Sequence, residues 1–221
     1  MGQQVLPFYL VCDESGSMAG EPIKTINDAL PKLHKEIGLN PVVSDKTQFS
    51  IIGFSDTAEV LLEMSDLSQV TGLPVLGPKG GTNFAAALQC VKEQIEQDVE
   101  RLKRDGHKVY RPVVFFLTDG HANTDWKTEW QDLTADTFPY RPNIVAFGIG
   151  QADETTISAV ATFKAFIVNR DMSPAAALQE FAVALTKSIV QSGSHSSNDG
   201  GMTLQTPDNI PGFTSLTVAE L

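Results

Sequence analysis

Short runs of consecutive apolar residues alternate with helix-like patterns along most of this chain. Five runs are apolar on successive residues, which indicates strands covered on both faces, as in a parallel sheet between two layers of helices. These five runs occupy residues 5–12, 47–54, 111–118, 142–150 and 164–169. A sixth run, 57–64, is apolar on one face only and follows the second run closely, so it predicts a hairpin to an antiparallel edge strand.

Amphipathic patterns between these runs predict the helices. The clearest pattern covers residues 83–105 and ends before Gly106, and others are predicted near 22–37, 126–133, 154–161 and 173–189. Trp126 and Trp130 are interpreted as core and edge packing of the predicted helix at 126–133. Pro31 lies inside the first pattern, and its ring removes the hydrogen bond to the carbonyl of Asn27. We therefore expect the first helix to kink or to end near Pro31.

Strands that alternate with helices predict a doubly wound α/β domain with a mostly parallel sheet, one antiparallel edge strand and helices on both faces. We assign residues 1–191 to this domain. The polar, glycine-rich stretch QSGSHSSNDGG at 191–201 is typical of a linker, so residues 192–221 are predicted to be a linker and a separable tail. Phe213, Leu216 and Val218 would let that tail dock as a strand or in a groove, on this molecule or on a neighbour.

Composition and charge narrow the classes of function. The chain has 221 residues, of which 42% are hydrophobic and 19% charged, as in ordinary soluble proteins. Its formal net charge of −11 argues against nonspecific binding to nucleic acid or to anionic membranes. No apolar run approaches the roughly 20 residues of a membrane span. The first apolar run is short, is interrupted by Pro7 and has no basic segment before it, so it does not resemble a signal peptide. We therefore expect a cytoplasmic protein, with Cys12 and Cys90 as buried, reduced thiols.

Oxygen-bearing side chains gather where the predicted strands end. Asp13, Ser15 and Ser17 stand at alternate positions after the first strand, Asp119 follows the strand 111–118, and Thr82 follows paired glycines in the loop GPKGGTN. Ligands of open α/β sheets bind at the carboxyl ends of the strands, so these side chains converge if the two strands are neighbours. Hard oxygen donors without sulfur or imidazole suit Mg²⁺, Mn²⁺ or Ca²⁺ rather than zinc. Five such side chains leave part of the shell to water or to an incoming ligand.

Enzyme motifs fit the same residues less well. An aspartyl phosphatase uses a second aspartate two residues after its nucleophile, but position 15 is serine. The stretch E-S-G-S-M is not the G-x-S-x-G of a serine hydrolase, and the glycine-rich loop lacks the Lys-Ser/Thr ending of a P-loop. A metal-assisted phosphohydrolase stays open as the alternative to a binding module. Glu14, His121 and Asn123 are expected to be exposed at the rim rather than ligands.

The five positions in this order resemble the metal-ion-dependent adhesion site (MIDAS) of von Willebrand factor A (VWA) domains: D13-x-S15-x-S17, then Thr82 after the paired glycines, then Asp119 in LTDG. The resemblance implies a Rossmann-like fold and a divalent cation, most often Mg²⁺. In that family the serines and the threonine contact the ion directly or through water, and the aspartates often act through water. A carboxylate of a protein partner completes the shell, which implies binding rather than catalysis.

A narrower resemblance rests on SGSMAGEPI and GGTN together with the cytoplasmic expectation. These features resemble the bacterial TerY-type proteins of tellurium-resistance and stress operons, which implies kinase- or phosphatase-like partners. The sequence therefore predicts a non-catalytic adaptor that binds a partner's Asp or Glu through a divalent cation.

Overall fold

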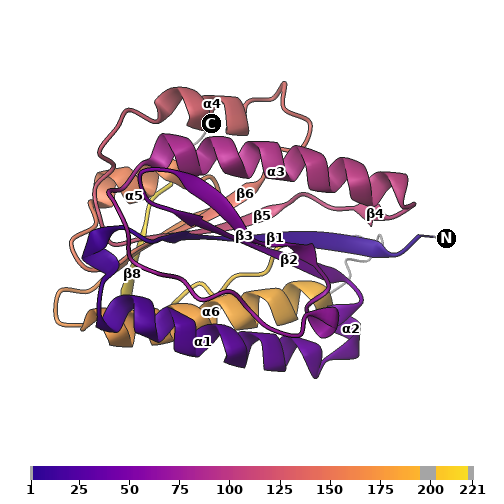
Figure 1. Ribbon diagram of the computed structural model, residues 1–221, viewed down its shortest axis with the longest axis horizontal. Coiled ribbons are helices and arrows are strands. Elements are labelled where there is room, and N and C mark those ends of the chain that lie inside the picture. The colour runs from indigo at the N-terminus through magenta and orange to yellow at the C-terminus, as the bar shows by residue number, and fades with distance from the viewer. Residues whose placement is uncertain (1, 195–202, 219–221) are drawn as a thin grey trace.

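The computed structural model describes residues 2–194 and 203–218 and shows one sheet between two layers of helices (Figure 1). The strand order is β3-β2-β1-β5-β6-β7-β8, and β4 pairs with the start of β1. The strands are β1 (Gln4–Asp13), β2 (Thr47–Phe54), β3 (Ala58–Ser65), β4 (Lys108–Val109), β5 (Val113–Thr118), β6 (Asn143–Gly148), β7 (Lys164–Val168) and β8 (Phe213–Leu216). The five central strands run parallel, whereas β3 and β8 are antiparallel strands at the two outer edges.

The helices cover both faces of this sheet, α1, α2 and α6 on one side and α3, α4 and α5 on the other (Figure 1). The helices are α1 (Glu21–Gly38), α2 (Pro41–Ser44), α3 (Phe84–Arg104), α4 (Lys127–Thr134), α5 (Glu154–Val160) and α6 (Pro174–Ser194), with single 3₁₀ turns at Gly16–Met18 and Leu67–Gln69. Among the helices of the described residues, none combines the length and the apolarity needed to cross a bilayer. The predicted doubly wound α/β fold is confirmed.

Alternate residues of the central strands belong to two separate hydrophobic cores, one on each face of the sheet, which explains why successive residues of these strands are apolar. On β1, Phe8 and Leu10 belong to the core beneath α1 and α6, whereas Tyr9 and Val11 belong to the core beneath α3. Trp126 and Trp130 pack against the second core, as the sequence predicts. Cys12 is buried and Cys90 is only partly buried, and both thiols are free, so the expectation of two buried thiols is wrong for Cys90.

The expectation that the first helix ends near Pro31 is wrong, because α1 runs without a break from Glu21 to Gly38. Leu30 and Leu33, on either side of the proline, are each 3% exposed and belong to the core beneath α1 and α6. Pro31 itself is exposed, so water can reach the backbone on the side where the hydrogen bond is missing. Burial of the apolar face therefore keeps the helix continuous despite the lost hydrogen bond, and a kink at Pro31 stays a prediction.

Replacement of Pro31 by alanine is expected to stabilise the domain by about 1–3 kcal/mol, because it restores a hydrogen bond and removes the ring from a helix interior. Thermal or urea unfolding measures this gain. Pro22→Ala is the matched control, since proline is well tolerated in the first turn, where Pro22 lies. An equal gain from both substitutions would contradict this account of Pro31.

The C-terminal tail contributes the last strand of the sheet. β8 pairs antiparallel with β7, and Ile210 and Phe213 are 3% and 5% exposed within the core beneath α1 and α6. The ring centroids of Phe213 and Phe147 lie 5.8 Å apart in an edge-to-face contact. Docking as a strand on this molecule is therefore the observed form, and the sheet has a second antiparallel edge that the sequence analysis did not assign. Whether residues 1–191 fold without the tail stays a prediction, and the packing argues against it.

Candidate metal centre

The predicted site lies at the carboxyl ends of β1 and β5, which are neighbouring parallel strands. Cys12 pairs with Leu117 in the strand register, so Asp13 at the end of β1 lies beside the Thr118–Asp119 end of β5. The chain order in this sheet changes direction at β1, since β2 lies on one side of it and β5 on the other. This is the switch point where ligands of open α/β sheets bind.

Hydrogen bonds link four of the five predicted ligands in one series. Ser15 Oγ and Ser17 Oγ are 2.9 Å apart and share a hydrogen bond, and Ser17 Oγ donates to Asp119 Oδ1 over 2.7 Å. The backbone N–H of Ser15 donates to Asp13 Oδ1 over 2.8 Å. This hydrogen-bonded series therefore leads from the fully buried Asp13 to the exposed Ser17.

Thr82 reaches the same rim from the glycine-rich loop. The backbone N–H of Gly16 donates to the carbonyl of Gly80 over 3.0 Å, which fastens this loop to the loop after β1. A Cβ placed on Gly120, next to Asp119, would lie 3.3 Å from Thr82 Oγ1, so the hydroxyl faces the Asp119 turn. Within the described residues, no hydrogen bond joins that hydroxyl to the other four side chains. The structure thus brings all five predicted residues to one rim and links four of them directly.

The charge of the site suits a cation. Burial raises the pKa of Asp13, and the neighbouring charge of Asp119 raises it further, against the lowering effect of hydrogen bonds from Ser15 and Thr118. Burial also raises the pKa of Asp119. Two partly desolvated carboxylates beside three hydroxyls form an all-oxygen donor set, which fits a hard divalent cation. Across the described ranges, no group of three or more His, Cys, Asp or Glu gathers as a metal cluster, so any site here depends on its hydroxyls.

Glu14 was expected to be exposed and is 2% exposed, which makes it the main error about this site. Its Oε1 accepts a hydrogen bond from the backbone N–H of Gly77 over 2.9 Å, and its Oε2 lies 3.4 Å from Lys79 Nζ. A Cβ on Gly53 of β2 would lie 2.1 Å from that Oε2, so the missing side chain leaves the space that the carboxylate fills. Glu14 therefore ties the loop after β1 to the loop that carries Thr82.

Two further residues support the site without having been predicted. Thr118 Oγ1 donates a hydrogen bond to Asp13 Oδ2, which orients the buried carboxylate. Asp56 Oδ1 accepts from the N–H of Gly81 over 3.0 Å, and Gly80 beside it adopts a φ of 60°, a conformation that glycine takes without strain. Thr118 directly precedes Asp119 at the end of an apolar strand, which was the available signal for it. Asp56 lies in the β2–β3 turn and carried no such signal.

His121 and Asn123 are exposed, as the sequence predicts, and lie on the loop after Asp119. The backbone N–H of Asn123 donates to the carbonyl of Thr82 over 3.0 Å, so this loop also borders the site. The rim is therefore built from three loops: the one after β1, the glycine-rich loop and the one after β5.

A family model places the chain among known domains. The model described as von Willebrand factor type A domain matches residues 8–182. The chain belongs to the VWA domain family. The matched range of this VWA domain contains all five predicted ligands and stops before the tail. No curated protein sequence matches the chain significantly.

Solved structures share the VWA fold at low sequence identity. The ArnB paralog VWA2 from Sulfolobus acidocaldarius is 16% identical with a TM-score of 0.57, over 85% of this chain and 46% of that one. The pilus adhesin SpaC from Lactobacillus rhamnosus GG, in an open conformation, is 13% identical with a TM-score of 0.62, over 86% and 30%. Proximal thread matrix protein 1 from the mussel byssus, with zinc in its MIDAS motif, is 17% identical with a TM-score of 0.58, over 86% and 48%. This chain thus spans about half of the length of the mussel and Sulfolobus proteins and less than a third of the pilus adhesin.

Proposed function

We propose that this VWA domain is a metal-dependent protein-interaction module that binds a carboxylate of a partner through a divalent cation. The observation that carries the proposal is the hydrogen-bonded series from buried Asp13 through Ser15 and Ser17 to Asp119. Ser15, Ser17 and Thr82 would hold the cation, with Asp13 and Asp119 bound directly or through water. The cation would supply the positive charge that attracts an Asp or Glu of the partner. VWA domains commonly serve as metal-dependent interaction modules, and the mussel neighbour is described with zinc in its MIDAS motif.

The ligand set favours Mg²⁺ as the cation, with Mn²⁺ or Ca²⁺ as the other hard candidates, because every donor is an oxygen atom. Two carboxylates leave little negative charge after a divalent ion is bound, and the three hydroxyls add none. The bound ion therefore keeps affinity for an anionic oxygen from outside the domain. Ser17 is exposed, so the partner's carboxylate would approach from its side of the rim.

Mg²⁺ is expected to raise the melting temperature of the wild-type domain, because a cation offsets the two carboxylates whose burial raises their pKa values. At 100 times the dissociation constant the gain is about 2.7 kcal/mol, or roughly 5–10 °C for a domain of this size. Asp13→Asn removes one charge without changing the shape, so it should abolish the gain while leaving the cation-free stability equal or higher. Asp28→Asn, on the exposed face of α1, is the control and should keep the full gain. A full gain in Asp13→Asn would place the cation elsewhere.

Binding to a protein partner is expected to require both the cation and an acidic side chain. A pull-down from cell extract in Mg²⁺, repeated in EDTA and with Asp13→Ala, identifies a partner that is lost in both cases. Replacement of a single Asp or Glu of that partner should then also abolish binding, because the ion is left without its anionic ligand. Undiminished binding in EDTA, with the site shown to be empty, would refute the mechanism even if the metal site is real.

A turnover assay separates this proposal from the phosphohydrolase alternative. A binding module should not turn over a generic phosphate ester such as p-nitrophenyl phosphate in Mg²⁺. Turnover that Asp13→Ala abolishes would favour the hydrolase. The narrower likeness to TerY-type proteins of tellurium-resistance operons stays a prediction, and identification of kinase- or phosphatase-like proteins in the pull-down would support it.

A further inference from the structure

An uncharged, largely apolar loop leads from β3 to the metal centre. Its residues 70–78, VTGLPVLGP, carry no charged side chain and run directly into the stretch that contains Thr82. Val75 is 81% exposed, more than any other large hydrophobic side chain of the described residues, and Pro78 is exposed as well. Single apolar residues are common on protein surfaces, whereas an exposed apolar run within one loop is typical of an interaction site.

Hydrogen bonds fix the backbone of this loop next to Val75. The N–H of Leu76 donates to Asn27 Oδ1 over 2.8 Å, and Asn27 Nδ2 donates to the carbonyl of Leu76 over 2.9 Å. The side chain of Leu76 is 2% exposed and belongs to the core beneath α1 and α6. The N–H of Gly77 then donates to Glu14 Oε1 over 2.9 Å. The loop is therefore held by the two residues that follow Val75, while the side chain of Val75 lies in solvent.

An exposed side chain on a fixed backbone is prepared for contact with a partner. Binding to a mobile loop loses free energy because the loop must be ordered, and here the hydrogen bonds of Leu76 and Gly77 already order it. The side chain of Val75 has a single χ1 torsion, so little rotamer freedom is lost when another surface packs on it. The favourable part of the contact is the removal of apolar surface from water.

Val75 is close enough to the metal centre to share one partner with it. It stands two residues before Gly77, so at most about 7 Å of chain separates their Cα atoms. Gly77 contacts Glu14, which lies between Asp13 and Ser15 in the chain. A standard protein interface covers about 800 Å² on each partner, which corresponds to a patch roughly 30 Å across. A partner whose carboxylate reaches the metal centre would therefore also cover Val75.

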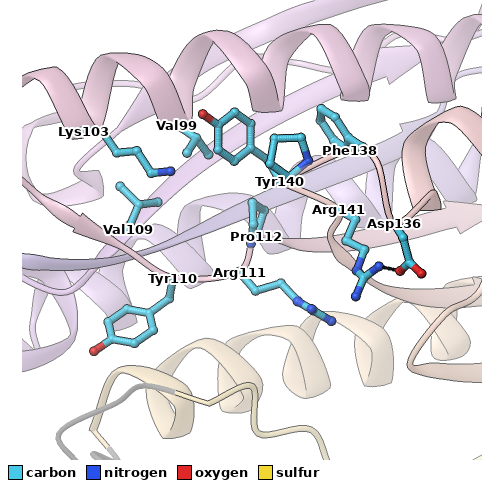
Figure 2. A pocket seen from close by; sticks show the side chains of 11 residues that line it. Val99, Lys103, Val109, Tyr110, Arg111, Pro112, Asp136, Phe138, Tyr140 and Arg141 are labelled. Atoms are coloured by element: carbon cyan, nitrogen blue, oxygen red, sulfur yellow. Dashed lines mark ion pairs between the residues drawn. The ribbon is translucent and has the colours of Figure 1, made fainter.

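The opposite end of the sheet lies outside such a patch. A cavity of about 310 Å³ opens there, where β5 and β6 begin, and Figure 2 shows the amine of Lys103 directed at the ring of Tyr140, 4.4 Å from its centroid. Leu39 is 72% exposed and follows the last residue of α1, a helix about 27 Å long that begins just after the loop carrying Ser15 and Ser17. Leu39 is thus an exposed apolar residue remote from the metal centre, which makes it a matched control for Val75.

We propose that the partner segment bound at the metal centre carries an apolar side chain near its Asp or Glu, and that this side chain packs on Val75. The inference rests on the function proposed above. A bound cation attracts any accessible carboxylate, so it does not by itself distinguish one acidic partner from another. An apolar contact at a fixed place beside the ion supplies that distinction, because only a partner with a matching apolar residue removes Val75 from water.

Fluorescence anisotropy in Mg²⁺ tests this with labelled peptides that carry one Asp in a Gly-Ser background. One Leu is placed at successive distances before or after the Asp, and the reference peptide has Gly in its place. The best Leu peptide is expected to bind at least about fivefold tighter than the reference, because a Leu and part of Val75 leave water. Val75→Ser should remove this preference, and Leu39→Ser should keep it.

Thermal shift in Mg²⁺ separates a contact role of Val75 from a structural one. Val75→Ser should keep the full shift, because the backbone of Leu76 and Gly77 holds the loop, and a lost shift would overturn the proposal. Peptides that bind only in Mg²⁺ but show no preference for Leu, or a preference that Val75→Ser and Leu39→Ser change equally, would overturn this inference alone. Peptides that bind no better in Mg²⁺ than in EDTA would overturn the proposed function and this inference with it.

Discussion

Truncation after Ser194 is expected to lower the melting temperature of this domain by roughly 10–20 °C. Ile210 and Phe213 are buried in the core beneath α1 and α6, and burial of each such side chain contributes about 1.5–3 kcal/mol. The tail also adds hydrogen bonds: β8 pairs with β7, and the N–H of Gln205 donates to Ser192 Oγ over 2.8 Å. A loss of several kcal/mol is a large part of the 5–15 kcal/mol that stabilises a typical domain.

Two point variants in the full-length chain test this without removing any backbone. Phe213→Ala should reproduce about 3–5 kcal/mol of the loss, because it empties a packed position against Phe147. Ser215→Ala, at an exposed position of the same strand, should change stability by less than about 0.5 kcal/mol. An unchanged melting temperature in the truncated chain would restore the boundary at residue 191 that the sequence indicates.

Removal of the Glu14 side chain is expected to weaken cation binding about tenfold or more, although Glu14 would not touch the ion. Its carboxylate holds the backbone of Gly77 and the ammonium of Lys79, and these residues lead to Thr82. Glu14→Ala removes the charged acceptor of the Gly77 N–H, and a hydrogen bond to a charged group contributes about 1.5–3 kcal/mol, so its loss releases the loop. Cation titration followed by the thermal shift in Mg²⁺ measures both effects.

Glu59 provides the matched control for Glu14, because it also pairs with Lys79 but its side chain is 56% exposed. Glu59→Ala should leave cation affinity within about twofold, as expected for a surface ion pair. Gly53→Ala tests the same contact from the other side, since its Cβ would meet Glu14 Oε2 and push the carboxylate away. If Glu14→Ala and Glu59→Ala behave alike, the buried carboxylate does not position the loop.

The six longer strands and most helices were predictable from the sequence, because burial against the helices leaves clear runs of apolar residues, whereas the two-residue β4 was not predicted. The ends of β1 and β5 were equally clear, since Asp13 and Asp119 stop those runs. The continuity of α1 through Pro31 was not predictable, because it depends on the packing of Leu30 and Leu33 against α6 rather than on local preference. The position of β8 was not predictable for a different reason, because four residues carry too little pattern to indicate which strand they pair with.

The residues of the candidate site were also only partly predictable from the sequence. Side chains that would contact an ion follow a fixed order along the chain and were found from that order. Glu14 was misjudged because an acidic residue between two ligands looks like a solvent-exposed position, and the space that accepts it is created by Gly53 on another strand.

The two antiparallel outer strands also bear on how this protein behaves at high concentration. An uncovered sheet edge offers unpaired backbone groups to other chains and promotes aggregation. On one edge, β3 carries the charged residues Glu59 and Glu63, and on the other β8 is only four residues long. Without β8, the edge of β7 with its apolar Phe166 and Ile167 would be open to pairing with another molecule. The tail thus serves solubility as well as stability, because β8 pairs with the edge of β7 to which a strand of another molecule could otherwise add.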